Sequence, residues 1–274
     1  MSGLVTGFKK PTRGIIMRRY WINKNQILTP AIGEFTVLFK DDLFHHIFEV
    51  CRQEVGHRFE VVTEDSKAYL VEVVSKEKKQ ARAKILEKRD INQLPTPLVH
   101  IALSVPRYTV MDSIIERSVE MGVSSILPFF SDFSFIRKVE NLPTGKQDRW
   151  QKIVISATQQ SGRGELMKIH EPLAWENMLK FINPSSQNWC LFAYEGATVL
   201  GVQAYLNAKK KNLDAPPDNL WIIVGSEGGF STAEVAEMQQ LGLNPVTLGP
   251  QILRVETACL TLVSILKYEF GLLT

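Results

Sequence analysis

Cysteine is scarce in this chain, with three residues in 274. Cys51, Cys190 and Cys259 lie far apart in apolar sequence, so we expect neither a disulfide framework nor a zinc site. They are typical of reduced core residues, and we expect a cytoplasmic protein. The five histidines show no ligand spacing with cysteine or carboxylate residues, so no bound metal is expected.

Long hydrophobic runs and targeting signals are also missing. No apolar stretch approaches the ~20 residues of a membrane-spanning helix, so we expect no membrane contact. The first residues, MSGLVTGFKKPTRG, have no apolar core behind their basic positions, and we expect no signal peptide. With 45% hydrophobic and 22% charged residues, the composition is that of a globular protein.

The charge is nearly balanced over the whole chain, at +3, but it is divided unevenly. Residues 1–97 contain 17 Lys and Arg against 12 Asp and Glu, a net +5. Residues 98–274 contain 15 against 17, a net −2. Ordinary surface variation explains such a difference, and nucleic-acid contact by the first part is the alternative.

The first part has the pattern of a small antiparallel barrel. Residues 1–16 show no periodicity and are expected to form a flexible extension. Short alternating runs follow from residue 18, separated by turn residues, as in RFEVVTED and AYLVEVVS. Between them, Leu43, Ile47 and Val50 recur at helical spacing, with Asp41 or Asp42 as the helix cap. Two prolines in INQLPTPL place the domain boundary near residues 91–98.

The second part alternates strands with longer helices. Residues 99–105, 124–130, 189–196, 219–229 and 244–250 are expected to contain strands, and residues 110–122 a helix with Met111, Ile114, Ile115 and Val119 on one face. This alternation predicts a largely parallel sheet with helices on both faces. Ligands bind such sheets at the carboxyl ends of the strands. The last helix, ETACLTLVSILKYEF, is apolar nearly all round, which predicts that it is covered on more than one side and contacts a second copy in a homodimer.

The strand-end sequence IIVGSEGGFS matches none of the common nucleotide or nucleophile motifs. The chain has no G-x-x-x-x-G-K-[ST], no G-x-G-x-x-G at this turn, and Ser226 is misplaced for a G-x-S-x-G elbow. Glu227 in the middle of the turn would repel a phosphate. A positively charged ligand that backbone groups can bind fits better, and S-adenosylmethionine is such a ligand.

A second turn, LGPQILRVETA at residues 248–258, makes the pattern specific. Together with VGSEGGFSTAE it resembles the carboxyl-terminal signature of the ribosomal RNA small-subunit methyltransferase E family. The resemblance extends over nearly the whole chain from Met17, through MRRYWI, HHIFEVCRQEVG, MDSIIERSVEMGVSSILPFF and RWQKIVISATQQSGR.

The resemblance implies the fold and the reaction. Members of the family use S-adenosylmethionine to methylate N3 of a uridine in 16S ribosomal RNA of the small subunit. They are homodimers of the SPOUT class, an α/β fold with a deep trefoil knot. The resemblance therefore implies a PUA-like β-barrel RNA-binding domain at residues 17–94 and a SPOUT methyltransferase domain at residues 98–274. Periodicity alone predicts an ordinary doubly wound sheet, since knots are rare.

The resemblance also implies the site residues, grouped here by their role. Cofactor contacts are expected from three strand-end segments: Ala193, Tyr194 and Glu195; Val224, Gly225, Ser226, Glu227, Gly228 and Gly229; and Leu248, Gly249, Pro250, Ile252, Leu253, Thr257 and Ala258. RNA contacts are expected from Arg18, Arg19 and Arg52 of the barrel and from Arg163 of the second domain. For Arg52 the alternative is an ordinary surface salt bridge.

Three charged side chains are candidates for catalysis. Methylation of N3 requires that its proton be accepted and that charge on the flanking carbonyl oxygens be stabilised. Arg254 is placed to stabilise that charge, and Glu227 or Glu256 to accept the proton or orient groups. The alternatives are a helix-start role for Glu256 and a salt bridge between Arg254 and Glu256.

Several positions depart from the family's pattern. Ser226, Gln251 and Val255 stand where proline, arginine and threonine are usual; Asp132-Phe133 replaces Glu-Arg, and Met167 replaces proline. The departures at Ser226, Gln251 and Val255 leave open a non-catalytic RNA-binding or ribosome-assembly protein with the same fold. A third possibility, an α/β enzyme for a small acidic metabolite, is weakened by the basic barrel.

Overall fold

The computed structural model describes residues 18–28, 35–196, 200–211 and 215–273. The expected extension at residues 1–16 lies outside these ranges. The chain divides into two compact units. One extends to Val62 and includes Ala68–Arg89; the other combines Thr63–Lys67 with the chain from Asp90.

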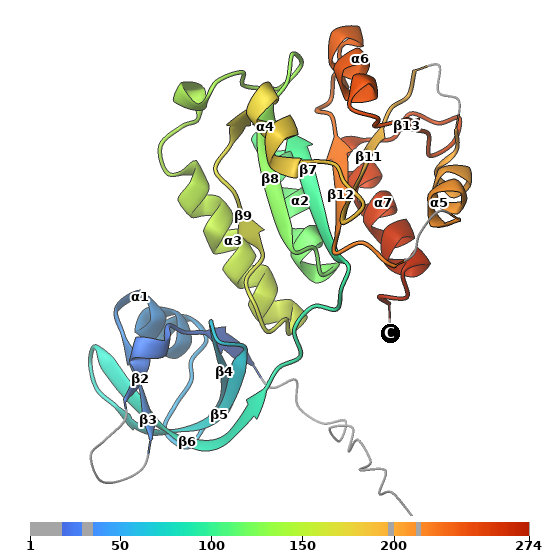
Figure 1. Ribbon diagram of the computed structural model, residues 1–274. Helices are drawn as coiled ribbons and strands as arrows, with labels where there is room; N and C mark the ends of the chain where they lie inside the picture. The colour runs from blue at the N-terminus through green and yellow to red at the C-terminus, as the bar shows by residue number, and fades with distance from the viewer. Residues whose placement is uncertain (1–17, 29–34, 197–199, 212–214, 274) are drawn as a thin grey trace, which may run out of the picture. The chain divides into compact units, whose positions relative to one another are not determined.

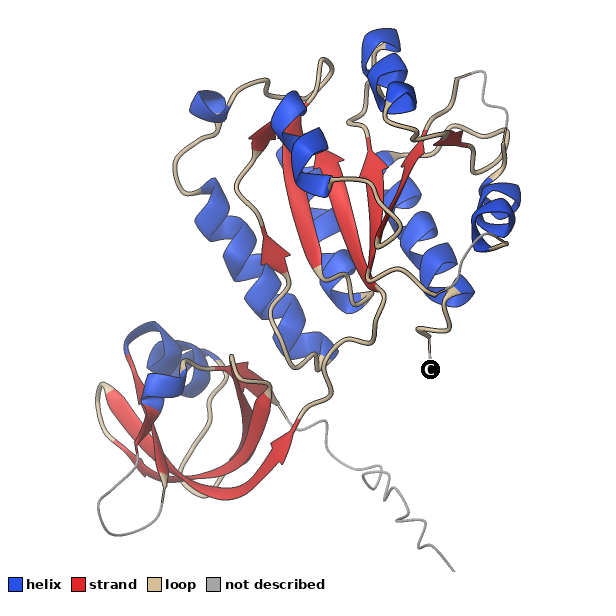
Figure 2. Ribbon diagram, in the orientation of Figure 1, coloured by secondary structure: helices blue, strands red, loops and turns tan. Residues whose placement is uncertain are grey.

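The first unit is built on a six-stranded sheet that curls in a barrel-like way (Figure 2). Its strands lie in the order β1-β4-β5-β6-β3-β2. Their bounds are β1 Arg19–Trp21, β2 Ile27–Leu28, β3 Thr36–Lys40, β4 Arg58–Thr63, β5 Lys67–Lys76 and β6 Gln80–Asp90, with a short 3-10 helix, η1, at Lys24–Gln26. Alternate side chains such as Val37 and Phe39 on β3 are fully buried and form the core of the unit. The expected period-two strands are confirmed.

Two details of this unit differ from the sequence-based prediction. Strand β1 pairs with β4 in parallel, with Arg19 opposite Glu60, so a purely antiparallel sheet is wrong at this pair. The expected helix begins as α1, Asp41–Phe44, and continues as a π-helix, η2, at His45–Val50. A π-turn inserts an extra residue, which shifts the buried face to Phe44, Ile47 and Phe48 and leaves Val50 exposed.

The second unit is an α/β fold whose seven-stranded sheet is parallel at every described pairing. Its main path is β10-β8-β7-β12-β11-β13, and β9 pairs with β8. The strands are β7 Leu98–Ser104, β8 Ser125–Phe130, β9 Lys168–Ile169, β10 Leu173–Ala174, β11 Asn188–Ala193, β12 Asn219–Val224 and β13 Pro245–Val246. The predicted parallel sheet is thus confirmed. Strand β12 lies between β7 and β11, although β11 precedes it in the chain.

Helices cover both faces of this sheet (Figure 1). They are α2 Tyr108–Glu120, η3 Val139–Asn141, α3 Lys146–Ser161, α4 Trp175–Ile182, α5 Val202–Lys210, α6 Thr232–Gln240 and α7 Val255–Glu269. Along β12, Ile222 packs into the cluster that contains α2, α3, α5 and α7, whereas Ile223 packs against α4 and α6. The four side chains predicted for the inner face of α2 are buried, as expected.

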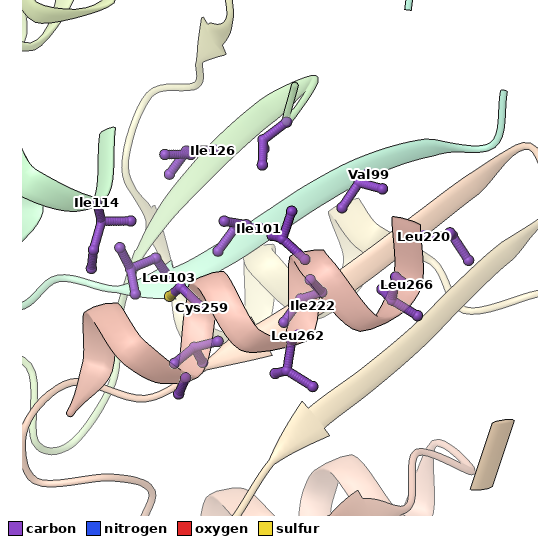
Figure 3. Close-up of a cluster of buried hydrophobic side chains, with 14 of the residues drawn as sticks. Val99, Ile101, Leu103, Ile114, Ile126, Leu220, Ile222, Cys259, Leu262 and Leu266 are labelled. Atoms are coloured by element: carbon purple, nitrogen blue, oxygen red, sulfur yellow. The ribbon is translucent and has the colours of Figure 1, made fainter. Parts of the chain in front are cut away.

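The last helix, α7, is covered by its own unit. Figure 3 shows Cys259, Leu262 and Leu266 lying against Ile101 and Ile222 of the central strands. Leu262 is fully buried, so the apolar circumference of the helix is explained without a second copy. A charge placed at Leu262 would therefore disrupt the core of the unit.

Two histidines of the second unit, the buried His100 and the partly buried His170, have lowered pKa values, and we therefore expect the stability of this unit to depend on pH. His100 stacks on Trp221 at 4.6 Å and bonds to Ser125 and Asn219. Burial, with Lys168 and His100 nearby, lowers the pKa of His170 from 6.5 to about 4. Between these pH values the unfolded chain binds a proton that the folded chain does not, so stability falls as the pH drops from 6.5 towards 4.

We expect the variant His170→Gln to show a weaker loss of stability on acidification than the unmodified protein. The measurement is the urea midpoint of unfolding at pH 7.0 and at pH 4.5 for both proteins. The difference between the two midpoints should shrink in the variant, because one proton-linked group has been removed. Equal differences in both proteins would contradict this role for His170.

Candidate functional site

A cavity of about 520 Å³ lies at the carboxyl ends of the central strands of the second unit. Its wall combines the turn after β11, the glycine loop after β12, the start of α2 and the segment that enters α7. The lining residues are Arg107, Thr109, Val110, Ala193, Tyr194, Glu195, Val224, Gly225, Ser226, Glu227, Gly229, Phe230, Ile252, Leu253, Arg254, Val255, Glu256 and Ala258.

The glycine loop after β12 folds tightly back on itself. Gly229 donates its backbone N–H to the Ser226 carbonyl at 2.9 Å and has a φ of +70°, a conformation that favours glycine. A Cβ atom at Gly225 would lie 2.8 Å from the backbone carbon of Gly229. Both glycines are therefore required by the shape of the loop that forms the cavity wall.

The two polar residues of this loop bond to neighbouring segments. Ser226 donates its hydroxyl to the carbonyl of Phe133 at 2.5 Å, which joins the loop to the turn after β8. Glu227 accepts the backbone N–H of Arg107 at 3.1 Å, which joins it to the turn after β7. These bonds fix three strand ends relative to one another around the cavity.

The helix that follows the loop begins with a capping box. Ser231 accepts the N–H of Glu234, and the buried Glu234 carboxylate accepts the N–H of Ser231 at 2.9 Å. The same carboxylate accepts the N–H of Asp132 at 2.8 Å. Glu234 thus holds the glycine loop and the turn after β8 together.

The entry to α7 brings two charged side chains to the opposite wall. Arg254 is the residue before the helix, is exposed, and its side chain makes no hydrogen bond or ion pair with any residue that the structure describes. Glu256 lies in the first turn and also lines the cavity. The alternative of an Arg254–Glu256 salt bridge is not seen, which leaves the Arg254 guanidinium available to a ligand.

The cavity is suited to a ligand with positive charge. Three carboxylates line it, from Glu195, Glu227 and Glu256, against the two cations Arg107 and Arg254. Backbone groups of the glycine loop and the apolar side chains of Val224, Leu253 and others complete the wall. Such a mixture of apolar lining and a few placed polar groups is typical of small-molecule sites.

Comparison with known proteins decides the family. A sequence model of the RNA methyltransferase domain matches residues 92–267, and one of the RNA methyltransferase PUA domain matches residues 39–86. The ribosomal RNA small subunit methyltransferase E of Mesomycoplasma hyopneumoniae is 32% identical over 200 residues, which is 72% of this chain and 79% of that protein. The chain belongs to the ribosomal RNA small subunit methyltransferase E family.

Other members of the family match over almost their full length. The methyltransferase E of Buchnera aphidicola subsp. Schizaphis graminum is 28% identical over 255 residues, 92% of this chain and 95% of the relative. A crystal structure of the Neisseria gonorrhoeae methyltransferase E bound to S-adenosylmethionine superposes with a TM-score of 0.73 at 26% identity. It covers 92% of this chain and 97% of that chain.

The structure gathers most of the residues that the family resemblance implied for the cofactor. Leu248 and Gly249 line a smaller adjoining hollow with Ala193, Tyr194 and Glu195. Gly228, Pro250 and Thr257 line neither space, which differs from the prediction. At Gly228 an added Cβ would lie 2.7 Å from Cβ of Phe133, so this glycine is required by the neighbouring turn.

The sequence-based prediction missed part of the cavity wall. Arg107, Thr109 and Val110 follow the end of β7, and Phe230 and Val255 complete two segments already predicted. The signal for the first three was present, because β7 is a central strand and ligands gather at the carboxyl ends of such strands.

The arginines predicted to contact RNA have different surroundings. Arg18 is exposed and donates to the carbonyl of Cys51 at 2.9 Å. Cys51 is the residue before Arg52, which is also exposed. Arg19 is half-buried and paired with Glu60 at 2.6 Å, and Glu60 also binds Arg89. Arg18 and Arg52 are therefore the exposed cations of this set.

Arg163 does not fit the predicted RNA contact. Its side chain is only 6% exposed and donates to the carbonyl of Val123 at 2.6 Å, with Glu165 at 3.7 Å. Burial lowers its pKa to about 10. Close by, Lys267 donates to the carbonyl of Met121 at 2.9 Å, so both cations bind carbonyls that follow α2. A structural role for Arg163 replaces the prediction.

Metal clusters and membrane-spanning helices are both missing from the described residues. No group of three or more histidine, cysteine, aspartate or glutamate side chains in these residues is arranged to hold a metal ion. No helix in the described part of the chain is long and apolar enough to span a membrane.

Proposed function

We propose that this chain is an S-adenosylmethionine-dependent methyltransferase that modifies N3 of a uridine in 16S ribosomal RNA of the small ribosomal subunit. The observation that carries the proposal is the cavity at the strand ends, with three carboxylates and a free arginine in its wall. Family membership and the cofactor bound by the Neisseria gonorrhoeae relative support it.

The cavity fits S-adenosylmethionine in size and charge. Its volume of about 520 Å³ lies within the usual range of ligand sites. The carboxylates of Glu195, Glu227 and Glu256 complement a sulfonium and an ammonium group. The glycine loop exposes backbone groups that can pair with an adenine edge, as the family resemblance implies for this segment.

The residues of this chain would divide the work of the reaction. Bound S-adenosylmethionine supplies an activated methyl group. The base must be held in line with that methyl group, and charge that develops on the uracil carbonyl oxygens must be stabilised. Arg254, which has no protein partner in the described residues, is the group we assign to that charge. Glu227 or Glu256 accepts the N3 proton.

We propose the domain organisation that the sequence predicts. The first unit, within residues 17–94, is a PUA-like RNA-binding barrel, and residues 98–274 form the methyltransferase domain. We further propose the SPOUT fold with its deep trefoil knot for the second domain. Membership of the methyltransferase E family supports this.

We expect Arg18 and Arg52 to contribute to RNA affinity through phosphate contacts. Replacing both by alanine should weaken binding of small subunits and reduce the slope of log K against log salt by about two units. Binding is measured by sedimentation of labelled protein with subunits at several salt concentrations. Arg149→Ala, which removes an exposed arginine of the second unit, is the control and should leave the slope unchanged. An unchanged slope in the double variant would remove these arginines from the RNA interface.

We also propose that the protein is a homodimer through the outer side of α7. Tyr268 is 76% exposed there, and Ile265 on the same helix is partly exposed. Light scattering on the unmodified protein at micromolar concentration should give twice the mass of the chain. Tyr268→Glu should shift the mass towards the monomer. A monomeric unmodified protein would refute the dimer.

The cofactor proposal is tested by calorimetric titration with S-adenosylmethionine and S-adenosylhomocysteine. We expect saturable binding of both at micromolar to submillimolar concentrations. Absence of binding at millimolar ligand would favour a non-catalytic RNA-binding or assembly protein with the same fold.

A further inference from the structure

The turn Ser131–Phe135, which follows β8, is held by a network of buried hydrogen bonds. The hydroxyl groups of Ser104, Ser131 and Ser134 form a buried triad, with Ser104 at 2.6 Å from Ser131 and 2.9 Å from Ser134. Ser134 also accepts the N–H of Ser131 at 2.7 Å. This buried network of three hydroxyl groups fixes the conformation of the turn.

The same turn is tied to the segments that form the cavity. The N–H of Asp132 bonds to Glu234, the carbonyl of Phe133 accepts from Ser226, and the N–H of Phe135 donates to the carbonyl of Val105 at 2.9 Å. Ser226 itself lines the cavity. The position of the turn is therefore coupled to the loop that we assign to the cofactor.

This rigid turn presents two aromatic rings to the surface. Phe133 is 48% exposed and Phe135 is 52% exposed. Phe135 packs against the edge of the Tyr108 ring, at 5.3 Å between centroids and an interplanar angle of 83°. Single exposed phenylalanines are common, but here a network of buried hydrogen bonds holds two of them beside a ligand cavity.

Cations lie near the Tyr108–Phe135 ring pair or follow it in the chain, whereas the exposed Asp132 precedes Phe133. Lys146 lies 4.1 Å from the centroid of the Tyr108 ring, and Arg107, at the rim of the cavity, precedes Tyr108 in the chain. Arg137 and Lys138 follow Phe135 and are both exposed. Aromatic faces set among cations are the arrangement by which proteins bind single-stranded RNA, since the bases stack and the phosphates meet positive charge.

We propose that Phe133 and Phe135 form a stacking platform for an unpaired RNA base next to the methyl-transfer cavity. The inference rests on the proposed RNA methyltransferase function and names a part of its substrate contact.

RNA fits this surface better than a second copy of the chain does. An apolar interface between copies would bring the cations of one surface against those of the other by symmetry. RNA instead supplies phosphates to the cations and bases to the rings. The oligomeric state of the variants below distinguishes the two occupants.

The test compares Phe133→Ala, Phe133→Leu and Phe133→Tyr in methylation of small subunits that lack the modification. Stacking on an aromatic face predicts that KM for the subunits rises on the order of 10-fold in the alanine and leucine variants. Phe133→Tyr keeps the ring and should behave like the unmodified protein. The salt dependence of KM should be unchanged in all three, because no phosphate contact is lost. Phe181→Ala, which removes a similarly exposed phenylalanine on α4, is the matched control.

Two further measurements separate this inference from the proposed function. Affinity for S-adenosylmethionine, measured by calorimetry, should be the same in every variant, which shows that the turn keeps its structure. Leucine restoring full activity, an unchanged KM in Phe133→Ala, or a change of mass in light scattering would each overturn the platform. Failure of the unmodified protein to methylate subunits would instead refute the proposed function, and the platform with it.

Discussion

Replacement of Arg254 by alanine is expected to reduce methyl-transfer turnover by ~100-fold or more, because the side chain stabilises charge developing on the uracil carbonyl oxygens. Arg254 precedes α7, lines the cavity and has no side-chain partner in the described parts of the chain. Its removal therefore leaves no buried group without a partner, and the fold should be unaffected. Turnover is measured with small subunits and labelled S-adenosylmethionine at saturating concentrations.

Two controls separate catalysis from binding in this experiment. Affinity for S-adenosylmethionine and for small subunits should be nearly unchanged in Arg254→Ala, because the contact forms fully only in the transition state. Arg254→Lys keeps the charge without the planar fork and should recover part of the lost turnover. A fully active alanine variant would assign the role to another residue, with Glu227 the next candidate.

Replacement of Gly225 by alanine is expected to abolish detectable cofactor binding. The added Cβ would lie within 2.9 Å of three backbone atoms of Gly229, so the loop must open and its backbone groups must leave their positions. Backbone clashes of this kind cannot be relieved by a rotamer change. We expect loss of affinity by at least ~100-fold in calorimetry, with a native far-ultraviolet spectrum, because the loop lies outside the regular elements.

Gly201 provides the matched control for this substitution. A Cβ atom at Gly201 would meet no described atom within 4 Å, and its φ of −67° suits any residue. Gly201→Ala should therefore bind S-adenosylmethionine like the unmodified protein. Normal affinity in Gly225→Ala would remove the glycine loop from the cofactor site.

The sequence predicts the second unit well because its signals are local. The central strands are mostly apolar runs, and α2 has its four predicted side chains buried. The glycine turns follow from the same pattern, since they end buried strands and begin helices. Periodicity does not predict the strand order, because nothing in the β12 sequence indicates that this strand lies between β7 and β11.

The differences arise where tertiary contacts override local pattern. A π-turn moves the buried face of the helix after β3, and Val50 becomes exposed although its spacing is helical. Arg163 lies in a basic loop after a helix, which suggests an exposed contact. Its guanidinium is instead buried and donates to the carbonyl of Val123, which follows α2. One side of the last helix is covered within its own unit by β7 and β12, which periodicity does not specify.

The candidate site shows the same division. Residues on the two glycine turns were identified from sequence because glycines and charges mark them. Arg107 was missed because it follows a strand end without a distinctive motif, and it enters the site only when β7 is placed beside β12. The exposure of Phe133 could not be predicted from sequence, since it follows from how the turn after β8 folds.

The most direct test is methyl transfer from labelled S-adenosylmethionine to small ribosomal subunits prepared from a strain that lacks the modification. The labelled nucleotide is then located by nuclease digestion and mass mapping. We expect one labelled position per subunit, with the methyl group on N3 of a uridine in 16S ribosomal RNA. Label on a ribose or a guanine would contradict the uridine assignment, and absence of label from a protein that binds S-adenosylmethionine would contradict the proposed substrate.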